Sequence, residues 1–136
     1  MHVMNVDIET YSDVDITKTG AYAYAESPAF EILLIAYKID DGPVEVIDVT
    51  KTLLTYGNHG SDSSLIRKAQ RDCIENVFPV FWNCLQSTDY IKTAYNANFE
   101  RTCLAAYLNT PMPPEQWRCT AVHAATLGLP ATLGAV

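Results

Sequence analysis

Two carboxylates stand two residues apart near the amino terminus, in the stretch from Met4 to Thr10. In a β-strand the side chains alternate between faces, so Asp7 and Glu9 would share one face while the apolar residues around them point the other way. Two carboxylates at this spacing can bind one divalent ion together, or one of them can bridge a pair of ions. The same spacing is common on the solvated face of a half-buried strand. The pair is therefore a candidate metal site whose assignment depends on the rest of the chain.

A third acid lies at the junction between a predicted strand and a predicted helix. The strand covers 91–95, and Asn96 or Asn98 can cap the helix that follows, whose apolar face includes Phe99. Glu100 then falls in the first turn of this helix, at the end of a strand. Taken alone, an acid in a first turn is better explained by its favourable interaction with the helix dipole.

The elements around these acids predict a mixed α/β fold. The apolar run over 30–39, the Asp-Asp-Gly turn after it and the alternating stretch over 44–49 predict a β-hairpin, which extends the first strand into a three-stranded antiparallel meander. Between the first two strands, the polar stretch predicts a single helical turn over 15–19, capped by Asp13 and ended by Gly20.

The second half of the chain reads as helices and short strands. Residues 51–60 predict a loop, and from Ser61 apolar residues recur every four positions up to Leu85, which predicts an amphipathic helix capped by Ser61 or Asp62. Pro79 predicts a break near Val77, because proline cannot donate to the preceding turn. A short strand over 117–120 and a helix over 121–127 follow, and we expect the fold to be incomplete at its carboxyl end.

Composition restricts the classes of function. The 136 residues are 49% hydrophobic and carry a formal net charge of −7, which predicts a single domain over 1–136 and argues against nucleic-acid binding through a basic surface alone. The sequence contains no long apolar window and no signal peptide, so we expect a soluble, cytoplasmic protein with no membrane contact. The four cysteines lack metal-site spacing, apart from Cys119 and His123 four apart, which have no second ligand pair nearby.

Three segments together resemble the DnaQ-like, or DEDD, superfamily of 3′ to 5′ exonucleases, and most closely the amino-terminal proofreading domain of phage and prophage DNA polymerases of the polymerase I type. They are Asp7-Ile8-Glu9-Thr10, Asn96-Ala97-Asn98-Phe99-Glu100, and Arg118-Cys119-Thr120 with Leu127-Gly128-Leu129-Pro130 after it. The lead-in from Tyr24 to Leu34 adds to the likeness, which covers nearly the whole chain. The resemblance implies a ribonuclease H-like mixed sheet flanked by helices.

The resemblance also implies roles for individual residues. Asp7 would bridge two divalent cations, Mg²⁺ or Mn²⁺; Glu9 would bind the ion that activates the attacking water, and Glu100 would serve the second ion. Cleavage of a phosphodiester with two ions has this logic, and carboxylates are the hard ligands that these ions prefer. Residues that would contact the 3′ end of single-stranded DNA, or support the ligands, are Thr10, Asn96 and Phe99.

Two departures from the family pattern matter. The second motif usually ends in Asp, whereas here the acid is Glu100, which is one methylene longer. The third motif, a Tyr or His four residues ahead of an Asp, has no match after Glu100, and Tyr11 with Asp15 lies beside the first motif, in the wrong place. Because losing such a group typically reduces the rate by about 10² to 10⁴, we predict that the 136-residue chain releases little or no mononucleotide from single-stranded DNA with Mn²⁺.

Two other functions fit the same residues. One is a stand-alone exonuclease acting on RNA or oligonucleotides, and the other is a non-catalytic ribonuclease H-like module whose acids are only surface charge. As partners the resemblance implies a polymerase domain, in the same full-length chain or complex. Uncovered apolar surface around Leu129, Leu133 and Val136 predicts self-association.

Overall fold

A five-stranded mixed sheet forms the centre of the computed structural model, which describes residues 1–56 and 63–130. The first three strands pair antiparallel, and the last two run parallel to the first. This arrangement confirms the predicted meander and the α/β class, and it is consistent with a ribonuclease H-like fold. In spatial order the strands are β3 (Val44–Asp48), β2 (Glu31–Ile39), β1 (His2–Tyr11), β4 (Tyr90–Ala94) and β5 (Trp117–Cys119).

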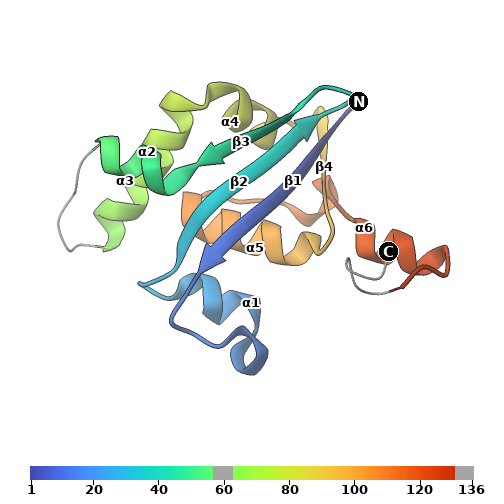
Figure 1. Ribbon diagram of the computed structural model, residues 1–136, viewed down its shortest axis with the longest axis horizontal. Coiled ribbons are helices and arrows are strands. Elements are labelled where there is room, and N and C mark those ends of the chain that lie inside the picture. Colours follow the sequence, from blue (N-terminus) through green and yellow to red (C-terminus); the bar gives the residue numbers. More distant parts are fainter. Residues whose placement is uncertain (57–62, 131–136) are drawn as a thin grey trace.

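Helices cover one face of this sheet. In Figure 1 the helix α5 crosses behind β1 and β2; α3 contacts α5, and α4 contacts α3. The described helices are α1 (Ile16–Glu26), α2 (Val49–Tyr56), α3 (Ser63–Val77), α4 (Pro79–Gln86), α5 (Ala97–Leu108) and α6 (Thr120–Thr126), with a 3₁₀ turn over Pro114–Gln116.

Burial alternates along β1 as the sequence predicts. Met4, Val6 and Ile8 are buried under the helices, whereas Asp7 and Glu9 are exposed on the opposite face. The core continues into α5, where Leu104, Tyr107 and Leu108 are fully buried. Burying each of these large side chains contributes about 2 kcal/mol, so α5 is held firmly against the sheet.

The predicted loop over 51–60 is wrong in its first half, because α2 occupies Val49–Tyr56. Asp48 ends β3 and begins this helix: its carboxylate accepts from the Lys51 backbone N–H at 2.9 Å and its carbonyl accepts from the Thr52 hydroxyl at 2.8 Å. Val49 is buried, and its burial favours the helix over a loop. The remainder of that loop, and the predicted capping residues Ser61 and Asp62, lie outside the described residues.

The helical turn predicted over 15–19 is part of a longer element. Asp15, rather than Asp13, caps α1, because its carboxylate accepts from the Thr17 N–H at 3.0 Å. Gly20 has a φ of 82°, which breaks the helix there as expected, but helical turns resume and run on to Glu26. The carboxylate of Asp13 instead accepts a hydrogen bond from the Ser27 hydroxyl and so ties the two ends of this segment together.

The break predicted near Val77 is confirmed. Helix α3 ends at Val77 and α4 begins at Pro79, where the missing N–H and fixed φ of proline suit the first position of a helix. The Trp82 N–H then bonds the carbonyl of Phe78 at 3.0 Å. The second helix buries Phe81, Cys84 and Leu85 against the core.

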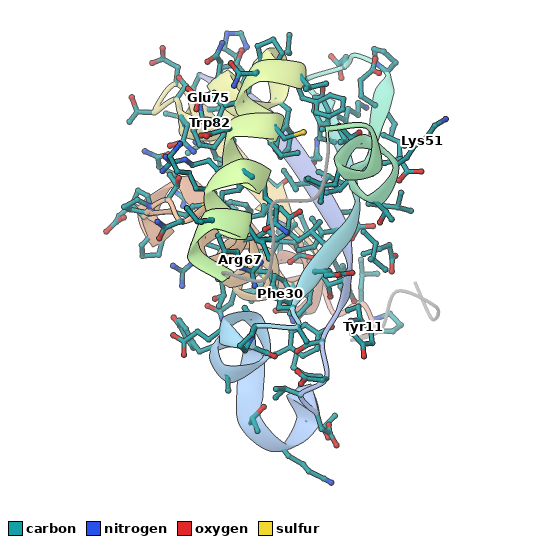
Figure 2. The ribbon with its side chains drawn as sticks, turned by 90° about the vertical axis from the view of Figure 1, so that its left-hand side faces the viewer. Tyr11, Phe30, Lys51, Arg67, Glu75 and Trp82 are labelled. Atoms are coloured by element: carbon teal, nitrogen blue, oxygen red, sulfur yellow. The ribbon has the colours of Figure 1, made fainter. Side chains whose placement is uncertain are left out.

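Arg67 of α3 joins three elements. Its guanidinium lies over the rings of Phe30 and Tyr107, 5.4 Å from each centroid, and donates to the carbonyl of Ser27 at 3.2 Å. Figure 2 shows Arg67 and Phe30 beside each other at one end of α3. The residue therefore links α3 to α5 and to the connection between α1 and β2.

We expect Arg67→Ala to lower the free energy of unfolding by about 2 kcal/mol, because it removes two cation–π contacts and a charge-assisted hydrogen bond. Urea unfolding followed by circular dichroism measures this change. The matched control is Arg71→Ala on the same helix, whose guanidinium is 4.0 Å from the Asp72 carboxylate, and its effect should stay within about 0.5 kcal/mol. Equal effects of the two variants would contradict the prediction.

Candidate metal site at the end of the first strand

Asp7 lies on the open face of the sheet, beside a shallow cavity. The cavity has a volume of about 260 Å³, and Asn5, Lys38, Thr93 and Asp7 line it together with apolar residues of β1, β2 and β4. Asn5 and Thr93 face each other on parallel strands, with a hydrogen bond of 2.6 Å between their side chains. Asp7 is exposed to solvent at a cavity whose surface is otherwise mostly apolar.

Glu100 is carried to the same end of the sheet by the parallel pairing of β1 and β4. Asn5 pairs with Thr93, and α5 begins three residues after β4 ends, so its first turn lies at the carboxyl end of β1. The side chain of Glu100 is only 5% exposed, and its Oε2 atom is buried with no hydrogen-bond partner. A carboxylate in this position lacks the partners that normally offset the loss of water.

The pKa of Glu100 is raised from 4.5 to about 7: burial is the largest cause, its own backbone N–H acts in the opposite direction, and the negative charge of Asp7 makes a smaller raising contribution. The charge of Asp7 is therefore felt at Glu100, although the two residues are far apart in sequence. A cation between them would offset both the burial and the repulsion.

Glu9 shares the exposed face with Asp7, and a bulge in the β1–β2 ladder separates it from Thr10. Within residues 1–56 and 63–130, no three His, Cys, Asp or Glu side chains are grouped closely enough to form a ready metal site. Glu9 is therefore not gathered with Asp7 and Glu100 into a compact cluster.

The three predicted substrate contacts are close in sequence to the candidate acids: Thr10 follows Glu9, and Asn96 and Phe99 precede Glu100. Thr10 is half-buried and its hydroxyl is 3.0 Å from the hydroxyl of Tyr24. Phe99 is half-buried, with its ring centroid 6.0 Å from that of Tyr24. Asn96 is exposed; its side chain makes no capping bond, and its carbonyl accepts from the Phe99 N–H at 2.8 Å.

Tyr24 thus joins two of the predicted site residues, and sequence reasoning did not single it out. The signal available was its place at the start of the lead-in over 24–34, which contributed to the family resemblance.

The donor set suits a hard divalent cation. Asp7 and Glu9 present exposed carboxylates, and Glu100 presents a buried oxygen without a partner, which is the kind of atom that a bound ion satisfies. Such ligands favour Mg²⁺ or Mn²⁺ over softer metals.

The fold and the site together describe an α/β domain with a mixed, ribonuclease H-like sheet and carboxylates at the carboxyl end of its first strand. No family model matches this chain, and no solved structure matches it significantly. Within the described part of the chain, no helix is long and apolar enough to cross a membrane.

The chain is, however, similar in sequence to a curated protein. The chain is 48% identical over all 136 of its residues to a DNA polymerase of Bacillus phage SP02, and it spans 18% of that protein's length.

Proposed function

We propose that this chain is part of a proofreading 3′ to 5′ exonuclease domain of a phage-type DNA polymerase. The observation that carries the proposal is the buried carboxylate of Glu100, which has an oxygen without a hydrogen-bond partner and whose pKa is raised by burial and, to a smaller extent, by the charge of Asp7. Similarity to a phage DNA polymerase supports the association with a polymerase. The substrate would be the single-stranded 3′ end of DNA.

Asp7, Glu9 and Glu100 would hold two divalent cations, Mg²⁺ or Mn²⁺. Bound there, these ions supply an activated water and stabilise the charge that develops on the leaving oxygen. The residues of the chain itself would attract and hold the cations. Asp7 and Glu9 attract them from solvent, and the buried carboxylate of Glu100 attracts a cation more strongly than an exposed carboxylate does, because the local dielectric constant is lower. Thr10, Asn96 and Phe99 would contact the terminal nucleotide.

The proposal also resolves a difficulty of charge. A chain with a formal net charge of −7 repels a phosphate backbone. Cations held at the end of β1 reverse the sign of the local field and allow DNA to approach there.

Titration with Mn²⁺, followed by water-proton relaxation, tests the proposal without requiring turnover. We expect the unaltered chain to bind Mn²⁺ and Asp7→Asn to bind it about 10-fold more weakly, because a lost unit charge near solvent is worth about 1 to 2 kcal/mol. The control is Glu75→Gln, which neutralises an exposed acid of α3, labelled in Figure 2, and should leave the affinity unchanged.

An affinity unaffected by Asp7→Asn, or no binding at millimolar Mn²⁺, would exclude the metal site. The chain would then be better described as a ribonuclease H-like interaction module.

A further inference from the structure

The side chain of Tyr24 lies between the two segments that carry the acids. Its hydroxyl is 3.0 Å from the hydroxyl of Thr10, next to Glu9 on β1. Its ring is 6.0 Å from the ring of Phe99, next to Glu100 on α5, with the ring planes tilted by 47°. One side chain therefore contacts the neighbours of both acids.

Tyr24 is itself held from two directions. Its ring meets the edge of Phe30, a residue only 1% exposed, with centroids 5.6 Å apart. Its carbonyl accepts from the hydroxyl of Ser12, one residue after β1, at 2.9 Å. Because both its ring and its backbone are held in place, Tyr24 restricts the positions of the two side chains that it contacts, Thr10 and Phe99.

The segment of β1 that Tyr24 contacts needs such support. The register of β1 with β2 shifts between Glu9 and Thr10, and at a bulge the ladder no longer fixes the direction of the neighbouring side chains. The hydroxyl contact between Tyr24 and Thr10 lies immediately after this shift.

We propose that Tyr24 is a positioning residue that fixes the acidic end of β1 relative to the first turn of α5, and thereby sets the affinity of the site for divalent cations. This inference rests on the proposed function, because it concerns the same site. Groups that orient metal ligands without touching the metal typically account for 10- to 100-fold in affinity, roughly.

The test measures the Mn²⁺ affinity of Tyr24→Phe, of Thr10→Val and of the double variant. Urea unfolding first establishes a temperature at which all three variants are folded, and the titrations are carried out at that temperature. Each single variant should weaken binding by about 10-fold, and the double variant by the same factor, because both changes remove one shared contact. Tyr24→Leu, which also removes the ring contact with Phe99, should weaken binding more than Tyr24→Phe.

Tyr90→Phe is the matched control, since it removes a tyrosine hydroxyl at the amino end of β4, beside His2 and at the other end of the strand from the acids, and should leave Mn²⁺ affinity unchanged. Unchanged Mn²⁺ affinity in both Tyr24→Phe and Tyr24→Leu would overturn the inference, as would losses that add in the double variant. If Asp7→Asn weakens Mn²⁺ binding while the Tyr24 variants do not, the positioning role alone fails. If Asp7→Asn also binds normally, the metal site itself fails.

Discussion

Glu100→Gln is expected to stabilise the metal-free protein by about 3 kcal/mol at pH 8 and to have little effect at pH 4. The pKa of Glu100 rises from 4.5 to about 7 on folding, mainly because the carboxyl is buried. A difference of this size corresponds to about 3 kcal/mol between the two protonation states. Glutamine has nearly the same shape and no charge, so it avoids burying a carboxylate.

The direction of the pH dependence follows from the two pKa values. Below about pH 4 the folded and unfolded chains both hold the proton, and Glu100 contributes no pH dependence. Between pH 4.5 and about pH 7 the unfolded chain releases the proton of Glu100 while the folded chain keeps it. The free energy of unfolding therefore falls as the pH rises through this range. Above that range the folded chain is also ionised, and the contribution of this group levels off.

Urea unfolding of the unaltered chain and of Glu100→Gln at pH 4, 6 and 8 measures this contribution. The difference between the two should grow over this range, whereas Glu75→Gln, at an exposed position, should follow the unaltered chain at every pH. Asp7→Asn should make the fall of the free energy of unfolding with pH slightly less steep, since it removes the charge of Asp7 but leaves Glu100 buried. Parallel pH profiles for the unaltered chain and Glu100→Gln would contradict the prediction.

Mn²⁺ binding at pH 6 should release a proton from Glu100. With a pKa of about 7, this carboxyl is protonated in about nine-tenths of the metal-free molecules at pH 6, and a metal ligand must be deprotonated. We therefore expect release of about 0.9 proton per bound site at pH 6 and of about 0.1 at pH 8. The affinity for Mn²⁺ should rise from pH 6 to pH 8, because fewer molecules must lose the Glu100 proton before the ion binds.

Calorimetry in buffers of different ionisation enthalpy counts the released protons. Glu100→Gln should release none and should bind Mn²⁺ on the order of 100-fold more weakly, a larger loss than for Asp7→Asn because the buried charge acts in a lower effective dielectric. Glu75→Gln should behave as the unaltered chain does. Binding without proton release at pH 6 would show that Glu100 is not a ligand.

Local sequence patterns were sufficient to predict most of the elements. The alternation around Asp7 placed it on an exposed strand face, and Pro79 marked the boundary between α3 and α4, because these signals depend on neighbours a few residues away. The helix over Val49–Tyr56 was missed, since its start depends on the carboxylate of Asp48, which also fitted the end of a strand. The sequence also does not distinguish Asp13 from Asp15 as the cap of α1, because both acids shortly precede its first turn. The structure assigns the cap to Asp15.

By itself, the sequence determined where three candidate oxygen ligands lie locally: two on one strand face and one in the first turn of a helix. Only the tertiary structure decided that the first turn of α5 lies at the carboxyl end of β1, because the parallel pairing of β1 with β4 joins parts of the chain that no local pattern connects. It also decided that Glu100 is buried with an oxygen lacking a partner, that the three acids form no compact cluster in the described part of the chain, and that Tyr24 contacts both Thr10 and Phe99. Burial and charge–charge distance arise from packing across the whole domain, and these quantities set the pKa of Glu100.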